Sequence, residues 1–177
     1  AATARQHGLQ LSLVEATITV NETQKAYFFD KIESYYRGQL KGRTLAIWGV
    51  AFKADTDDIR EAPAIDMIHK LLQAGANLRV FDPAALPNLR KQYPGWPIYY
   101  ASHLYEALEG ADALLIFTEW GEFRQPDWPK MKNTLRHPVI FDGRNLYDPF
   151  LLAQEGFDYL SIGRAPVYAY SSTLARS

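Results

Sequence analysis

The fold is decided by one stretch of the chain, Thr44-Leu-Ala-Ile-Trp-Gly-Val-Ala-Phe-Lys-Ala-Asp-Thr-Asp-Asp-Ile-Arg-Glu-Ala-Pro63. It begins with an apolar run, from Leu45 to Phe52, with the character of a strand buried on both faces of a parallel sheet. A charged segment follows directly, and apolar residues then return at helical spacing between Ile65 and Leu72. Proline near the first helical position, with acidic residues just before it, is typical of a helix start. The stretch therefore predicts a strand, a charged loop and a helix, the unit from which nucleotide-binding sheets are built.

The chain after this unit alternates short apolar strands with helices. Five more strands are expected, at Leu78–Asp82, Ile98–Ala101, Ala113–Thr118, Val139–Asp142 and Tyr159–Ile162. Helices are expected at Leu104–Leu108, Pro126–Leu135 and Pro149–Gln154. The segment between residues 83 and 97, which contains three prolines after Pro83, is expected to be a loose connection. Such alternation implies parallel pairing and right-handed crossovers, so the predicted fold class is α/β, a Rossmann-like open parallel sheet flanked by helices.

The chain before the sheet has the pattern of one long helix. Between Leu11 and Arg37 there is neither glycine nor proline, and aromatic and aliphatic residues recur at helical spacing from Phe28 to Tyr36. Only the segment Ala16–Asn21, in which β-branched residues alternate, favours a strand on its own pattern. The pattern therefore predicts helix in the rest of residues 1–40 and a Rossmann-like domain over residues 41–177.

Composition and charge place the chain among globular proteins and exclude several classes of function. Its 177 residues are 47% hydrophobic and 22% charged, which is ordinary for a soluble domain. The net charge of −1 gives no basic field for nucleic acid or an anionic membrane, and no apolar run approaches the ~20 residues of a membrane span. The first residues show no signal-peptide pattern, which predicts a cytoplasmic location. Without cysteine, the chain can form neither a disulfide nor a cysteine-based metal site.

The loop after the first strand lacks the glycines that a dinucleotide site requires. The pattern G-x-G-x-x-G lets the backbone approach a pyrophosphate, but here the single glycine, Gly49, is followed by bulky residues. Lys53 stands at the end of the strand instead, where it could meet a phosphate as a point charge. Ligands of open parallel sheets bind beyond the carboxyl ends of the strands. Lys53, Glu119-Trp120 and Arg144 all follow predicted strands, so we expect them to converge on one crevice.

Several motifs, in this order along the chain, resemble one protein family. They are Ala51-Phe52-Lys53, Thr56-Asp57-Asp58, Arg60-Glu61-Ala62-Pro63, Phe117-Thr-Glu-Trp-Gly-Glu-Phe-Arg124 and Val139-Ile-Phe-Asp-Gly-Arg-Asn-Leu-Tyr-Asp-Pro149. Together they resemble the C-terminal, UDP-binding domain of the nucleotide-sugar dehydrogenases, the UDP-glucose/GDP-mannose dehydrogenase family. The similarity is strongest to the members that oxidise UDP-glucose. The family also has a long central helix that joins its two domains, and Val20-Asn21-Glu-Thr-Gln24-Lys25 is similar to the pattern of that helix. The resemblance therefore implies one long connecting helix within residues 1–40, which continues through Ala16–Asn21.

The resemblance implies an oxidoreductase that depends on NAD. Enzymes of this kind convert UDP-glucose to UDP-glucuronate, for polysaccharide biosynthesis, by a four-electron oxidation that passes through a cysteine thiohemiacetal. This chain contains no cysteine and no G-x-G-x-x-G motif. The resemblance therefore implies that the chain is the UDP-sugar-binding portion of such an enzyme, without the domain that holds most of the NAD, and that it is inactive alone. It also implies a homodimer formed through the N-terminal helix.

The resemblance assigns binding roles to four residues and a catalytic role to none. Phe52, Lys53 and Arg144 would contact the UDP-sugar, and Arg60 would reach the NAD held by the missing domain. Gly143 is expected to adopt an unusual backbone angle that aims Arg144 inward. Each binding residue also has an ordinary alternative: packing for Phe52, solvation for Lys53, an ion pair with Asp142 or Asp148 for Arg144, and one with Asp57 or Glu61 for Arg60.

Other polar residues are not expected to form sites. Asp55, Asp57 and Asp58 lack the spacing of an EF-hand and are interpreted as acids that precede a helix start. The histidines are scattered without metal-ligand spacing. Asp82 occupies the position of a ribose-binding acid, but without the glycine fingerprint we interpret it as a turn residue before Pro83.

Three other functions are compatible with the sequence. A related dehydrogenase would act on GDP-mannose or a UDP-N-acetyl sugar, although the segments around Trp120 and Arg144 favour UDP-glucose by resemblance. A non-catalytic nucleotide sensor would be complete in itself. A receiver-type interaction domain would bind Mg²⁺ through its acids and would have no affinity for nucleotides.

Overall fold

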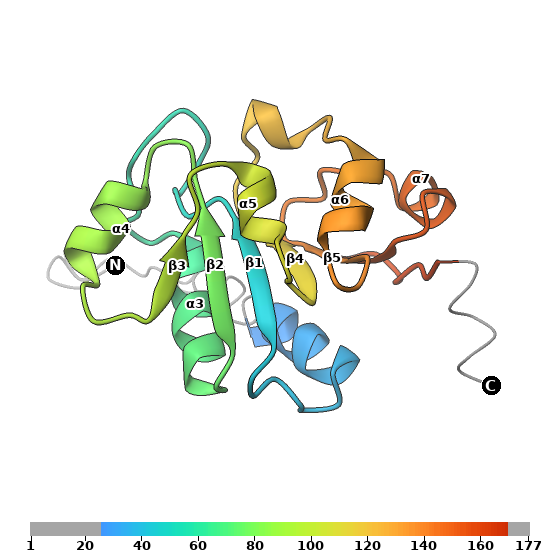
Figure 1. Cartoon of the computed structure of the whole chain (residues 1–177), viewed down its shortest axis with the longest axis horizontal. Coiled ribbons are helices and arrows are strands. Elements are labelled where there is room, and N and C mark those ends of the chain that lie inside the picture. The colour runs from blue at the N-terminus through green and yellow to red at the C-terminus, as the bar shows by residue number, and fades with distance from the viewer. Residues whose placement is uncertain (1–25, 170–177) are drawn as a thin grey trace, which may run out of the picture.

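Six parallel strands form one sheet in the computed structural model, which describes residues 26–169 (Figure 1). The strand order is β3-β2-β1-β4-β5-β6, and every neighbouring pair is parallel. The strands are β1 (Thr44–Trp48), β2 (Asn77–Phe81), β3 (Ile98–Tyr100), β4 (Ala113–Ile116), β5 (Val139–Asp142) and β6 (Asp158–Ser161). This order, with β1 and β4 at the centre, is that of the Rossmann-type α/β sheets. The predicted fold class is confirmed.

The central strands are continuous apolar runs because helices cover both faces of the sheet. In β1 every residue after Thr44 is buried, and β4 and β5 are buried throughout. In Figure 1, α5 (Leu104–Leu108) and α6 (Trp128–Thr134) lie in front of the sheet, whereas α3 (Pro63–Gln73) lies behind it. None of the helices in the described part of the chain is long and apolar enough to cross a membrane.

In the part of the chain that the structure describes, proline lies in the first turn of four helices, and one of these helices was not predicted. The predicted bounds of α5 and of α7 (Pro149–Gln154) are confirmed, while α6 begins at Trp128, with Asp127 as its N-cap, and not at Pro126. The segment expected to be loose contains a helix, α4 (Leu86–Gln92), with proline in its first turn. Proline costs no hydrogen bond there because the first helical N–H groups have no acceptor within the helix. A short 3-10 helix, η1 (Gly121–Phe123), was also not predicted.

The described part of the N-terminal helix, residues 26–35, packs against the sheet. Phe28 and Ile32 are buried, and the ring of Phe28 contacts Phe117 edge-on with centroids 5.6 Å apart. The helix ends at residue 35, two residues before the predicted end at Arg37. The part of the predicted helix before residue 26, including the Val20–Lys25 motif, lies outside the described residues. The division of the chain at residue 40 stays a prediction.

Candidate functional site

Three loops meet at the carboxyl edge of the sheet, where the candidate site lies. They follow β1, β4 and β5, which are neighbours in the sheet, and they contain the predicted site residues Phe52, Lys53, Arg60 and Arg144. The carboxyl ends of parallel strands share one edge. The sheet order therefore brings together the segments that the sequence separates by almost a hundred positions.

The loop after β1 is held between the ends of β2 and β4. The backbone of Gly49 has φ +85°, and a Cβ atom there would lie 2.5 Å from Cβ of Thr118, so only glycine fits. The amides of Val50 and Ala51 donate to Oδ2 of Asp82 over 2.7 and 3.0 Å. On the other side, Oγ1 of Thr118 donates to the carbonyl of Ala51 over 2.6 Å. The turn that leads to Lys53 is therefore fixed from both neighbouring strands.

Phe52 and Lys53 project from this fixed turn. Phe52 is 50% exposed, while its amide donates to the carbonyl of Asp58 over 2.8 Å. Lys53 is exposed and forms no hydrogen bond or ion pair with any residue that the structure describes. The core alternative for Phe52 is therefore wrong. Its exposed face and the Lys53 ammonium are both accessible to a ligand.

Arg144 lies on the turn after β5 and pairs across the edge of the sheet with the β4 loop. Its Nη2 lies 3.1 Å from Oε1 of Glu119, so the partner is neither of the two aspartates that the sequence suggested. Asp142 instead accepts the backbone N–H of Arg144 over 2.8 Å. The Glu119 carboxylate also lies 3.6 Å from Nη2 of Arg124. Arg144 is thus held beside the central strands by a carboxylate that it shares with a second arginine.

The backbone of Gly143 does not adopt the unusual angle that was expected from the sequence. Its φ does not lie in the left-handed region, and the residue of this turn that does is Asn145, with φ 55°. A Cβ at Gly143 would lie 2.9 Å from the carbonyl oxygen of Ile116. The glycine is needed because the turn passes close to the end of β4.

Arg60 forms a pair within its own loop. Its Nη2 lies 2.7 Å from Oδ2 of Asp58, so the pairing expected with Asp57 or Glu61 is wrong. Hydrogen bonds from Arg60 lower the pKa of the exposed Asp58 carboxyl from 3.8 to about 2. The interpretation of Asp58 as a helix-start acid is also corrected, because the N-cap of α3 is Ala62 and no side chain caps it.

A cavity of about 450 Å³ opens beside this pair, between the β1 loop and α4. It is lined by Asp58, Ile59, Arg60, Asn88, Lys91 and Gln92. The β1 loop is tied to α4 here, since Nδ2 of Asn88 donates to the carbonyl of Asp57 over 2.9 Å. The guanidinium of Arg60 therefore borders a hollow at the same edge of the sheet as Lys53.

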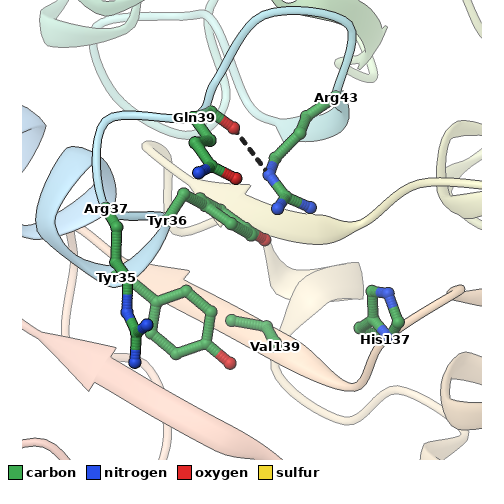
Figure 2. A pocket seen from close by; sticks show the side chains of 7 residues that line it. All are labelled: Tyr35, Tyr36, Arg37, Gln39, Arg43, His137 and Val139. Atoms are coloured by element: carbon green, nitrogen blue, oxygen red, sulfur yellow. Dashed lines mark hydrogen bonds between the residues drawn. The ribbon is translucent and has the colours of Figure 1, made fainter.

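A second cavity, of about 290 Å³, lies at the opposite edge (Figure 2). Its lining residues are Tyr35, Tyr36, Arg37, Gln39, Arg43, His137 and Val139. The Arg43 guanidinium lies 4.2 Å from the Tyr36 ring centroid, and its Nε donates to the carbonyl of Gln39 over 2.8 Å. Burial raises the pKa of the Tyr36 hydroxyl. This cavity is built at the amino ends of β1 and β5, away from the predicted site.

These features define a class: a Rossmann-type α/β domain with cationic side chains at the carboxyl edge of its sheet, where nucleotides bind in such folds. Residues 46–149 match the sequence profile of the UDP-glucose/GDP-mannose dehydrogenase family, UDP binding domain. The chain therefore belongs to that family, and the resemblance inferred from its motifs is confirmed.

Proteins of similar sequence agree with this family membership. The chain is 41% identical over 165 residues to a UDP-glucose 6-dehydrogenase of Pseudomonas aeruginosa. The aligned region covers 91% of this chain and 36% of that protein. It is 40% identical over 164 residues to the UDP-glucose 6-dehydrogenase TuaD of Bacillus subtilis, covering 93% of this chain and 35% of the relative. The chain thus spans about a third of the length of these relatives.

Solved structures show the same fold in related enzymes. A UDP-glucose dehydrogenase from Pyrobaculum islandicum superposes with a TM-score of 0.76 at 28% identity, over 93% of this chain and 35% of that one. A UDP-D-ManNAc dehydrogenase from Pyrococcus horikoshii superposes with a TM-score of 0.67 at 26% identity, over 88% of this chain and 34% of that one.

Proposed function

We propose that this chain is the UDP-sugar-binding portion of an NAD-dependent UDP-glucose 6-dehydrogenase, which oxidises UDP-glucose to UDP-glucuronate. The observation that carries the proposal is the exposed Lys53 on a fixed turn, at the same sheet edge as Arg144, in a chain of this family. The relatives at 40% and 41% identity are named for UDP-glucose, which favours this substrate over GDP-mannose or a UDP-N-acetyl sugar. Cytoplasmic location and a homodimer formed through the N-terminal helix belong to the same proposal.

Lys53 and Arg144 would both bind the diphosphate of the UDP-sugar, each in a different way. The ammonium of Lys53 has no partner among the described residues, so it can act as a point charge on phosphate without breaking an ion pair. The planar guanidinium of Arg144 suits two phosphate or sugar oxygens, and Glu119 already fixes one of its nitrogens. The half-exposed ring of Phe52 would lie against the nucleotide-sugar. Binding at these remote groups would position the reacting carbon of the sugar for chemistry elsewhere.

Arg60 would face the cofactor rather than the sugar. It borders the cavity between the β1 loop and α4, and its side chain is 83% exposed despite the pair with Asp58. An anion from NAD could therefore approach without displacing any buried group. We assign no catalytic residue to this chain, because the thiohemiacetal chemistry needs a cysteine and the sequence contains none. On this proposal the chain alone is inactive.

Calorimetric titration with UDP, UDP-glucose and GDP-mannose tests the proposal. The unmodified chain should bind UDP and UDP-glucose more tightly than GDP-mannose. The double variant Lys53→Ala, Arg144→Ala should lose at least tenfold in UDP affinity, because two charge-assisted contacts to phosphate disappear. Arg43→Ala is the control, since Arg43 lines the cavity at the opposite edge.

The control shows at which edge of the sheet the nucleotide binds. UDP binding that survives the double variant but is lost in Arg43→Ala would place the nucleotide in the other cavity and contradict the proposal. Mg²⁺ binding without nucleotide binding would instead support the receiver-type alternative.

A further inference from the structure

Asp82 is the most heavily hydrogen-bonded side chain at the carboxyl edge of the described sheet. It follows β2, is 3% exposed and accepts hydrogen bonds from five donors on three separate segments. Its Oδ2 accepts from the amides of Val50 and Ala51 over 2.7 and 3.0 Å, and from Nε1 of Trp120 over 3.3 Å. Its Oδ1 accepts from the amides of Ala84 and Ala85 over 2.9 and 2.8 Å.

These five bonds leave the carboxylate no capacity for a ligand. A carboxylate offers about four lone-pair positions, and five protein donors already surround this one. The acid at this place in a dinucleotide fold binds a ribose hydroxyl, but Asp82 is buried and fully used within the protein. The turn that the sequence suggested, through Ala84 and Ala85, accounts for only one of its two oxygens.

The other oxygen connects the two halves of the candidate site. Val50 and Ala51 immediately precede Phe52 and Lys53, so their amides set the course of the backbone that presents the lysine. Trp120 immediately follows Glu119, whose carboxylate holds Arg144 at 3.1 Å. A single buried oxygen therefore contacts both the β1 loop and the β4 loop.

We propose that Asp82 is a positioning residue for nucleotide binding: its carboxylate holds the Lys53 loop and the Glu119–Arg144 pair in fixed relation without touching the ligand. This inference rests on the proposed function. Groups that are fixed before a ligand arrives lose less conformational entropy on binding, and their affinity is correspondingly higher. When two cationic groups bind the same diphosphate, the affinity depends strongly on a fixed spacing between them.

The substitution Asp82→Asn is the direct probe because it keeps the size of the side chain. A carboxamide has one accepting oxygen, so its NH₂ group must face at least two of the five N–H donors. Either the β1 loop or the β2 turn then loses its acceptor, and a buried donor without an acceptor is costly. In either orientation the bonds from the Val50 and Ala51 amides lose the negative charge of the carboxylate, which makes such hydrogen bonds about twice as strong as neutral ones. We therefore expect faster exchange in the β1 loop while the sheet itself remains folded.

Asp112 supplies a matched control at the other end of β1. It is also 3% exposed, and its Oδ2 accepts the amide of Thr44 over 2.9 Å while Oδ1 lies 3.1 Å from Nη1 of Arg136. Asp112→Asn therefore removes a buried carboxylate from the same sheet at the edge remote from Lys53. A loss of binding caused by general destabilisation would appear in both variants.

The experiment compares both variants with the unmodified chain by thermal unfolding, amide hydrogen exchange and UDP titration. For Asp82→Asn we expect faster exchange in residues 49–58 and at least fivefold weaker UDP binding, at a temperature where the chain is folded. For Asp112→Asn we expect a comparable fall in Tm, unchanged exchange in residues 49–58 and UDP affinity within twofold of the unmodified chain. Unchanged exchange in that loop of Asp82→Asn, or equal loss of UDP affinity in both variants, would overturn the inference.

The two readouts separate this inference from the proposed function. If the unmodified chain binds no UDP, the proposed function fails, and hydrogen exchange alone decides whether Asp82 holds the loop. If Asp82→Asn does not fold, Trp120→Phe replaces it, since this variant removes the Nε1–H donor and keeps a smaller aromatic ring in the same place. We then expect faster exchange around Glu119 and weaker UDP binding, and unchanged values for both would contradict the inference.

Discussion

At the scale of single residues, both arginines predicted to bind ligands already hold a carboxylate of their own chain. Arg60 pairs with Asp58 and Arg144 pairs with Glu119. The Arg60–Asp58 pair is exposed and therefore screened by solvent, so a phosphate group can compete for Arg60 at little cost. The Arg144 side chain is 32% exposed, so its pair with Glu119 is screened less and fixes its direction more firmly. The pairs set the direction of the arginine side chains and leave most of their N–H groups available.

The Asp58–Arg60 pair predicts an acid-shifted carboxyl group. Its hydrogen bonds favour the ionised carboxylate, so the pKa of Asp58 falls from 3.8 to about 2. Because the folded-state pKa is the lower one, the pair stabilises the fold above pH 3.8, and this contribution is lost as the pH falls toward 2. Titration of the carboxyl carbon by NMR should give a midpoint near 2, and Arg60→Gln should return it toward 3.8.

A neighbouring substitution serves as the control for this titration. Lys91 lines the same cavity as Arg60 but forms no ion pair with Asp58. Lys91→Ala should leave the Asp58 midpoint unchanged. A midpoint near 3.8 in the unmodified chain would show that the pair does not persist in solution.

At the scale of secondary structure, the sequence predicts the strands better than it predicts the connections. Buried parallel strands are continuous apolar runs, and the predicted Val139–Asp142 agrees with β5 to the residue. The α4 helix was missed because its seven residues contain a single fully buried side chain, Leu89, and so have almost no amphipathic pattern. Its proline was taken as a breaker, although the first helical turn tolerates proline.

In the candidate site, too, the positions at the strand ends were predicted and the contacts between the loops were not. The strand ends are fixed by apolar runs, and with the strand order they place Lys53 and Arg144 at one edge. The partner of Arg144 and the donors of Asp82 depend on which loops face each other across neighbouring strands. Glu119 is 25 positions from Arg144, and Trp120 is 38 positions from Asp82. No local pattern predicts contacts of that separation.

Three of the short helices, α5, α6 and α7, have a side chain that caps their first turn, and α7 offers a clear test. Asp148 accepts hydrogen bonds from the amides of Phe150 and Leu151 over 2.8 and 3.1 Å. Asp148→Ala should lower the free energy of unfolding by about 1 kcal/mol, since it removes the N-cap acceptor. Asp148→Asn keeps an accepting oxygen and should cost less than half as much. Urea unfolding followed by circular dichroism measures both, and equal losses in the two variants would contradict the cap as the cause.

At the scale of the whole molecule, the helix over residues 26–35 belongs to the same core as the sheet. Its buried residues include Phe28 and Ile32, and Tyr35 contacts Phe141 of β5 edge-on with ring centroids 5.6 Å apart. The hydroxyl of Tyr36, just beyond this helix, donates to the carbonyl of Asp112 over 3.1 Å. A segment so anchored should fold together with the strands, even if the preceding residues serve dimerisation.

Ile32→Ala tests this cooperativity. Ile32 is fully buried, and truncating a buried isoleucine to alanine costs about 2–5 kcal/mol through lost burial and the remaining cavity. If the helix and the sheet unfold as one unit, the loss should appear equally in far-UV circular dichroism and in tryptophan fluorescence. The fluorescence reports on the four tryptophans, all of which follow residue 40 and one of which, Trp48, lies in β1. Urea unfolding curves recorded with both probes should shift together.

Glu33→Ala is the matched control, since Glu33 is exposed on the same helix. Its effect should stay within about 0.5 kcal/mol, as for most surface substitutions. If Ile32→Ala shifts the circular dichroism transition but leaves the fluorescence transition in place, the helix unfolds separately from the sheet. In that case the helix and the Rossmann-like domain are independent units, as the predicted division at residue 40 implies.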